Sequence, residues 1–169
     1  MAMETLKLNF PDEGIIPNSP LPLLVYKGAF EAGESLADDM ENRFAANNWT
    51  NSWRDGVYPY HHYHSITHEV VGIYSGHAQL HMGGEAGEVV EVQAGDVLVI
   101  PAGVGHKKIS ASDDFGVVGA YPDGRDFDLM TGQEDERPRA DERIAQVPLP
   151  DTDPVLGTEG GTRELWTMW

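Results

Sequence analysis

Between residues 57 and 121, apolar positions recur in short runs that turn residues separate at close intervals. Short runs with this spacing are typical of a β-sandwich or β-barrel. The links are shorter than the crossover that parallel strands require, so we expect antiparallel pairing. The predicted strands span residues 58–63, 69–74, 77–82, 88–92, 97–100, 106–109 and 115–121.

The first 20 residues are predicted to form an irregular arm, because proline and glycine interrupt any regular element there. Such an arm must lie on the main body or on a second subunit to be ordered. Residues 21–26 are apolar enough for a strand, and Pro22 within it favours an edge or strand-start position. The interrupting residues are Pro11, Gly14, Pro17 and Pro20.

One helix is predicted over residues 36–47. Leu36, Met40 and Phe44 recur every four residues and give this segment a single apolar stripe. Ser35 occupies the position of an N-cap residue. We therefore expect the stripe to pack into the protein core.

After residue 121 the chain becomes rich in Pro, Gly, Asp, Glu and Arg, which is typical of irregular structure. Apolar residues still recur there, so we expect much of this extension to lie against the sheet. A chain of 169 residues is long enough to bury a core of its own. The sequence thus predicts one all-β domain, with a core at 56–121, an arm and helix at 1–55 and an extension at 122–169.

The charge of the chain limits its partners. It carries 28 acidic and 11 basic residues, for a formal net charge of −17. This charge repels phosphate backbones and anionic lipid, so we expect neither nucleic acid nor a membrane surface as a partner.

The chain has no cysteine, which excludes disulfides, thiolate metal sites and cysteine nucleophiles. Nitrogen and oxygen atoms must therefore hold any bound metal. The N-terminal segment lacks a basic start followed by an apolar stretch, and no apolar run is long enough to cross a bilayer. We expect a cytoplasmic protein.

Histidines are the main candidates for chemistry. In an extended segment His62 and His64 share one face and could bind the same ion. His106 follows a tight turn that could bring it back beside them. For a fourth ligand, unbroken alternation places His68 on the same face, whereas a turn at 65–67 places Glu69 there, and periodicity does not decide between them.

Two stretches of the chain resemble the two sequence motifs of the cupin family. The first motif is glycine, five residues, His-x-His, three or four residues, glutamate, six residues and glycine. The second is glycine, five residues, Pro-x-Gly, two residues and histidine. All of these spacings fit, and only the asparagine that often ends the second motif is replaced, by Ser110. The matching residues are Gly56, His62, His64, Glu69 and Gly76, then Gly95, Pro101, Gly103 and His106.

The resemblance implies a double-stranded β-helix, a small antiparallel barrel with a metal ion inside. It selects Glu69 over His68, and the implied ligands are His62, His64, Glu69 and His106. Three imidazoles and one carboxylate suit divalent Fe, Mn, Ni, Co, Cu or Zn. The flanking sequences are also similar to a group of bacterial single-domain cupins of uncharacterised function.

Two functions agree with this resemblance. The first is a metalloenzyme with oxygenase-like or isomerase-like chemistry on a small molecule, and the second is a non-catalytic small-molecule or sugar-binding protein with a structural or absent metal. Tyr60 and Tyr121 are candidate hydrogen-bond donors in the pocket. Cupins of this kind often form homodimers, which we also expect here.

The remaining histidines are assigned no chemistry. His61 and His68 are expected to face away from the metal, and His77 and His81 alternate with smaller apolar residues that suit the interior better.

Overall fold

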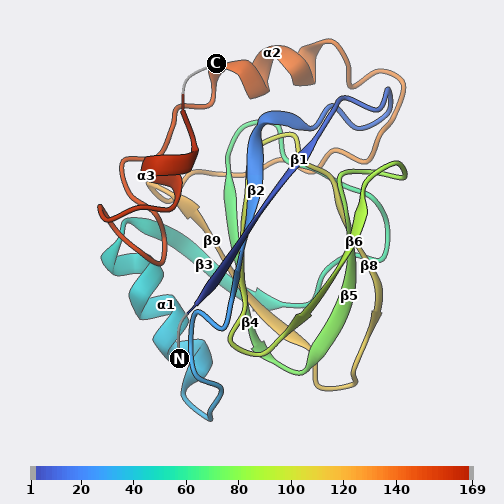
Figure 1. The fold of residues 1–169 in the computed structure, drawn as a ribbon. Helices are drawn as coiled ribbons and strands as arrows, with labels where there is room; N and C mark the ends of the chain where they lie inside the picture. Colours follow the sequence, from blue (N-terminus) through green and yellow to red (C-terminus); the bar gives the residue numbers. More distant parts are fainter. Residues whose placement is uncertain (1–2, 168–169) are drawn as a thin grey trace.

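The computed structural model describes residues 3–167 as a β-barrel with three short helices (Figure 1). No helix in that range is long and apolar enough to cross a membrane. The elements in chain order are β1 Glu4–Phe10, β2 Ser19–Lys27, α1 Leu36–Ala46, β3 Trp49–Asp55, β4 Glu69–Ser75, β5 His77–Met82, β6 Glu88–Gln93, β7 Val97–Ile100, β8 His106–Ala111, β9 Gly116–Pro122, α2 Arg139–Gln146 and α3 Thr162–Leu165.

The strands form two sheets, and every strand pair within them is antiparallel. A six-stranded sheet has the order β1-β2-β7-β4-β9-β3, and a three-stranded sheet has the order β6-β5-β8. Figure 1 shows the smaller sheet facing the larger one. This arrangement confirms the predicted all-β, double-stranded β-helix fold.

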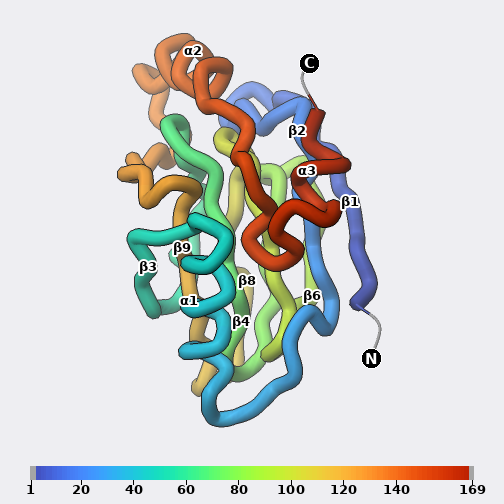
Figure 2. The backbone as a smooth tube through the Cα atoms, turned by 90° about the vertical axis from the view of Figure 1, so that its left-hand side faces the viewer, coloured from blue at the N-terminus to red at the C-terminus, as the bar shows by residue number. Residues whose placement is uncertain are grey.

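The central strands of the large sheet are buried on both faces, which explains the nearly continuous apolar runs of β2, β7 and β9. Side chains such as Val25, Leu98 and Val117 point between the two sheets. Their neighbours point to the outer face, where α1 and the C-terminal extension cover them (Figure 2). The extension therefore lies against the sheet, as its apolar residues predicted.

Helix α1 confirms the predicted stripe, because Leu36, Met40 and Phe44 are all buried. It packs closely over β4 at Gly72, where a Cβ atom would lie 2.7 Å from the Met40 sulfur. A larger residue at that position would force the Met40 side chain to move, so glycine allows the close approach of helix and sheet. Ser35 stands at the N-cap, but its side chain makes no capping hydrogen bond.

Two strands were not predicted, one within the arm expected to be irregular and one after the helix, where no element was predicted. Residues 4–10 form β1, which pairs with β2 along the edge of the large sheet, and residues 49–55 form β3 at the opposite edge. In β1 the apolar residues Leu6, Leu8 and Phe10 alternate with polar ones, so its own pattern also favours a strand. Strand β3 has no such alternation, and its pairing with β9 makes it a strand. The extension also contains two short helices, α2 and α3, that its composition did not predict.

Two expectations for strands are wrong. Strand β2 lies between β1 and β7 rather than at an edge. It tolerates Pro22 because its pairing with β7 is restricted to residues 24–26 and its pairing with β1 shifts register beside the proline. Residues 58–63 form no strand, although single β-bridges at His62 and Tyr63 and a hydrogen bond from the Lys108 N–H to the Tyr58 oxygen tie this segment to the rest of the molecule.

Candidate metal centre

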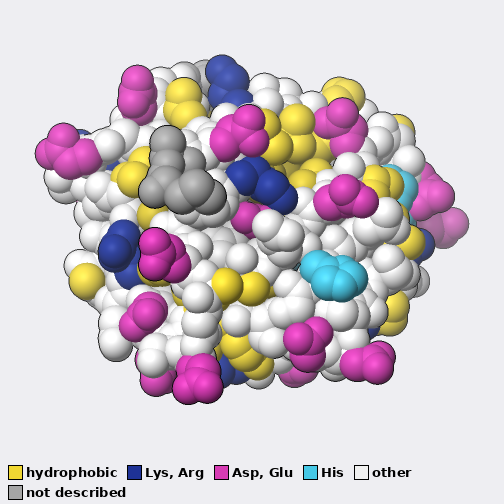
Figure 3. All heavy atoms as spheres, turned by 60° about the horizontal axis from the view of Figure 1, so that its bottom comes forward, with side chains coloured by type: hydrophobic (Ala, Val, Ile, Leu, Met, Phe, Trp, Pro, Cys, Tyr) yellow, Lys and Arg dark blue, Asp and Glu magenta, His cyan; other side chains and the backbone are white. Residues whose placement is uncertain are grey.

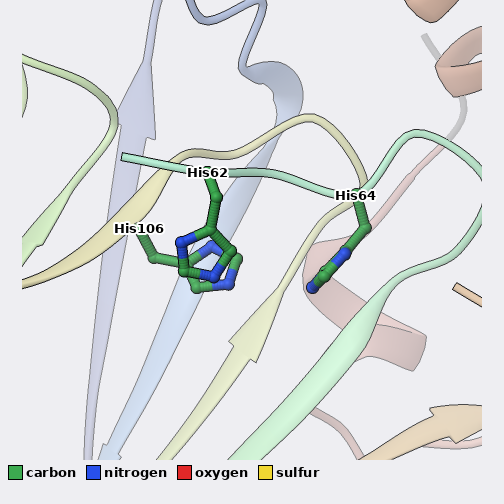
Figure 4. Close-up of side chains that lie close together, drawn as sticks. All are labelled: His62, His64 and His106. Atoms are coloured by element: carbon green, nitrogen blue, oxygen red, sulfur yellow. The ribbon is translucent and has the colours of Figure 1, made fainter. Parts of the chain in front are cut away.

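Two segments of the chain bring His62, His64 and His106 together. The first two lie in the irregular segment between β3 and β4, and His106 is the first residue of β8. His62 and His106 exchange two backbone hydrogen bonds, with N···O distances of 3.1 and 2.9 Å. This bridge pairs the two residues directly, and their imidazole rings overlap (Figure 4).

The three imidazoles form a compact buried cluster. One ring nitrogen from each residue lies within 4.8 Å of the others. The ring centroids of His62 and His106 are 4.0 Å apart, and that of His64 lies 5.9 and 5.5 Å from them. Each residue is at most 6% exposed. The cluster could hold a metal ion.

Hydrogen bonds orient each ring. The Nδ1 atoms of His62, His64 and His106 lie 3.0, 2.5 and 3.2 Å from the backbone oxygens of Tyr60, Asp128 and Val104. A carbonyl oxygen can only accept, so each Nδ1 carries the proton and donates it. In the neutral rings this leaves the lone pair on Nε2, which is the tautomer that a metal ligand needs.

Glu69, the first residue of β4, lies directly against this cluster. Its Oε1 atom is 3.4 Å from Nε2 of both His64 and His106, and the residue is 3% exposed. His68 points elsewhere: its Nδ1 accepts the Ala102 N–H, and its Nε2 lies 3.2 Å from the Pro148 oxygen. Between the two alternatives left open by periodicity, the structure therefore brings Glu69 and not His68 to the histidines.

The charges within the cluster are arranged for a cation. Burial, followed by the nearby His106, lowers the pKa of His62 to about 3, so this ring is neutral at pH 7. Burial acts to raise the pKa of Glu69, but the facing His64 and His106 hold it below its ordinary value. Burial likewise acts to lower the pKa of His64, but the Glu69 carboxylate outweighs it and raises that pKa. A divalent cation could replace the proton that His64 and Glu69 attract.

The two candidate tyrosines differ in position. Tyr121 is buried, and its hydroxyl accepts a hydrogen bond of 2.7 Å from the Trp53 indole N–H. Burial and the Glu69 carboxylate raise the pKa of Tyr121. Tyr60 is 39% exposed, and its backbone oxygen rather than its hydroxyl contacts His62. Tyr58 and Pro59 line the cavity beside the histidines, whereas Tyr60 is not among its lining residues, so a role of the Tyr60 hydroxyl stays a prediction.

A cavity of about 420 Å³ opens beside the cluster. Trp53, Lys108 and Phe127 are among the lining residues that the sequence did not single out. Alternation along the strand that begins at His106 could have found Lys108, whereas the other two come from segments whose position the sequence did not predict. A larger hollow of about 690 Å³ lies over β5, β6 and β8, and none of the clustered histidines lines it.

The segment around Asp128 holds His64 in place. Besides its backbone oxygen on His64, the Asp128 carboxylate accepts hydrogen bonds from the backbone N–H and the hydroxyl of Ser65. Phe127 packs against the His64 ring at a centroid distance of 5.6 Å and stacks on Tyr121 at 5.1 Å. The C-terminal extension therefore forms part of this site.

A second cluster lies on the other side of the 58–64 segment. It contains His61, His81 and Glu85, whose candidate ligand atoms also lie within 4.8 Å of one another. His61 Nε2 is 2.5 Å from Glu85 Oε2, and the Glu85 side chain is 78% exposed. We call this the outer cluster, and His62, His64, His106 and Glu69 the inner cluster.

No protein-family model matches the chain. Over 167 residues it is 46% identical to "Uncharacterized protein YjlB" of Bacillus subtilis (strain 168), with 98% of this chain and 99% of that protein covered. The chain belongs to the same family as this YjlB protein.

Solved structures show more distant similarity to this YjlB-family chain. A Klebsiella pneumoniae protein with a double-stranded β-helix domain is 18% identical, with a TM-score of 0.37 over 68% of this chain and 79% of that one. Acireductone dioxygenase from Bacillus anthracis, with cadmium in its active centre, is 19% identical, with a TM-score of 0.36 over 59% of this chain and 61% of that one. A shared fold does not transfer a substrate or a reaction.

Proposed function

We propose that this protein is a metal-dependent enzyme that acts on a small molecule at the inner cluster. His62, His64, His106 and Glu69 would hold one divalent ion of Fe, Mn, Ni, Co, Cu or Zn. The observation that carries the proposal is the shared orientation of the three imidazoles. Each Nδ1 is bound to a backbone oxygen, so each Nε2 is left free for the same ion.

The donor set fits such an ion. Imidazole and carboxylate groups suit first-row divalent metals, and this site needs no thiolate. Glu69 offsets part of the charge of the ion inside the barrel, where an unpaired charge would be costly. When bound, the metal supplies Lewis-acid or oxygen-binding chemistry, which supports an isomerase-like or an oxygenase-like reaction.

The protein itself positions the substrate and limits the access of water. Tyr121 and Phe127 form an aromatic wall on one side of the cavity, stacked with an interplanar angle of 17°. The cavity volume of about 420 Å³ suits a small molecule better than a polymer. The homodimer and the cytoplasmic location stay predictions.

Elemental analysis of untagged protein tests the proposal. We expect near-stoichiometric metal in the wild type, and its loss in His64→Ala and in Glu69→Ala. His81→Ala should keep its metal because it changes only the outer cluster, and His68→Gln should keep it because that ring bonds elsewhere. Metal that persists in His64→Ala but disappears in His81→Ala would assign the ion to the outer cluster and reject the proposal.

Turnover separates the enzyme from a non-catalytic binding protein. Oxygen consumption or conversion of a candidate substrate should occur in metal-replete wild type and disappear in His106→Ala. Reversible binding of a ligand that is recovered unchanged, at full metal occupancy, would support the binding protein instead.

A further inference from the structure

Lys108 points into the barrel, two residues after His106. In the β5–β8 pair, Met82 lies opposite His106 and Leu80 lies opposite Lys108. Directly opposed residues in antiparallel strands project from the same face of the sheet. Met82 and Leu80 are 0% and 2% exposed and belong to the core between the sheets. Lys108 therefore lies on the inner face, and it lines the cavity beside the histidines.

The ammonium group of Lys108 is not committed to an acidic partner. Within residues 3–167, none of the ion pairs or side-chain hydrogen bonds includes it. The other cationic residue lining the cavity, Arg54, is bound by Asp38 and Glu41, each at 2.7 Å. Lys108 therefore supplies a positive charge that no carboxylate of this part of the chain neutralises.

The charge of the surrounding protein makes this lysine unusual. The net charge of the chain is −17, and acidic side chains are spread across the end of the molecule seen in Figure 3. Two acidic residues line the same cavity, but Glu69 faces the histidines and Asp55 accepts the Gly56 N–H. Lys108 therefore gives this acidic protein a local positive charge beside the inner cluster, and this charge can attract an anion.

The remaining walls are largely apolar. Val71, Tyr121 and Phe127 line the cavity together with Trp53. Phe127 is 49% exposed, so the aromatic stack extends from the buried Tyr121 to the cavity mouth. A ligand here meets one cation and an aromatic surface, within the volume of a small organic molecule.

We propose that Lys108 binds the carboxylate of a small organic acid whose apolar part lies against Phe127 and Tyr121. The inference deepens the proposed function, and rests on it, by naming the substrate class of the same site. A single ammonium suits a monovalent carboxylate, whereas phosphate sites usually add arginine or several backbone N–H donors. A neutral sugar would gain no charge pairing from this half-buried cation.

Calorimetric titration of metal-replete protein with benzoate tests this inference, with benzamide as the neutral isostere. Wild type should bind benzoate in preference to benzamide. Lys108→Gln should bind benzoate roughly 10- to 100-fold more weakly, because a hydrogen bond to a charged group is lost. Lys108→Arg should restore part of the affinity. The matched control is Lys107→Gln, since Lys107 lies opposite His81 and faces outward, and it should bind as wild type does.

Metal content measured on the same samples separates the two proposals. If Lys108→Gln keeps its metal and binds benzoate as wild type does, the role of Lys108 is rejected and the metal site stands. If wild type holds no metal, the proposed function fails, and the titration is then read on metal-free protein. Loss of benzoate affinity in Lys108→Gln would still support the anion site in that case. Failure of wild type to bind either benzoate or acetate would overturn the inference.

Discussion

Adjacent histidines of one short segment enter two clusters that differ in how their rings are held. His62 and His64 point into the barrel, where backbone oxygens accept the proton of each Nδ1. His61 points outward, and its Nε2 contacts the exposed Glu85 while its Nδ1 is buried without a hydrogen-bond partner among the described residues. Each cluster combines imidazole and carboxylate groups. The candidate ligand atoms of the outer cluster lie within 4.8 Å of one another, and in the inner cluster Glu69 Oε1 lies 3.4 Å from His64 Nε2.

The difference shows that residue type and proximity do not by themselves define a metal centre. In the inner cluster, burial removes water and hydrogen bonds fix the tautomer, so the ligand atoms are oriented before an ion arrives. In the outer cluster, the carboxylate already occupies His61 Nε2, and solvent reaches the site. The predictions below test this contrast, from the largest expected effect to the smallest.

The unfolding free energy of metal-free protein should fall as the pH is lowered from about 6.5 to about 4.5. Burial lowers the pKa of both His62 and His68 to about 3, so the unfolded chain binds protons in this range that the folded chain does not. Each histidine contributes up to about 1.4 kcal/mol per pH unit, and this stability is fully present only above the unfolded pKa.

Urea denaturation of chelator-treated protein at several pH values measures this slope. Replacing His68 by Gln removes one of the two groups, so the slope should become shallower while some of it remains. A slope that is the same in His68→Gln and wild type would show that this imidazole is not kept neutral by the fold.

Asp128→Ala should weaken metal binding by roughly 10- to 100-fold, the usual effect of removing a group that orients a ligand. The Asp128 carboxylate holds Ser65, and this contact keeps the Asp128 oxygen in place for His64 Nδ1. Competition with a chromophoric chelator measures the affinity. Asp126→Ala, at an exposed position of the same segment, and Glu85→Ala, in the outer cluster, should leave it unchanged. Equal losses in all three variants would remove the special role of Asp128.

Tyr121→Phe should lower the unfolding free energy by about 1 kcal/mol, because the Trp53 indole N–H loses its acceptor. Tyr60→Phe is the matched control and should change it by less than about 0.5 kcal/mol, since this ring is more exposed. Urea midpoints measure both changes. If the Tyr60 variant loses more stability than the Tyr121 variant, the two rings have been assigned the wrong roles.

Much of the barrel could be predicted from the sequence because its central strands carry their own signals. The runs at β4, β5, β6 and β7 are apolar or alternating, and glycine-rich turns separate them. Edge strand β3 could not be found in this way, since its backbone pairing to β9 makes it a strand, whereas β1 has an alternation of Leu6, Leu8 and Phe10 that does indicate a strand. The prediction for residues 58–63 was wrong in the opposite way. Their tyrosine and histidine content suggested a strand, but their tertiary contacts do not form one.

The candidate ligands were found by spacing, but their surroundings were not. Alternation alone left His68 and Glu69 open, since a turn between 65 and 67 changes the parity and its presence cannot be read from periodicity. The inward position of Lys108 could have been predicted from the same alternation. Asp128 and Phe127 could not be predicted, because they come from an extension whose contacts with residues 64–65 and with β9 depend on the folded barrel.

The sequence by itself determined the antiparallel barrel, the helix stripe and the residues that could serve as metal ligands, because periodicity and motif spacing are local properties of the chain. Only the tertiary structure decided which ring nitrogen each histidine offers, which of two neighbouring residues completes the inner cluster, and which lysine enters the cavity. Those properties depend on backbone oxygens and side chains far away in the chain, and only folding brings them together.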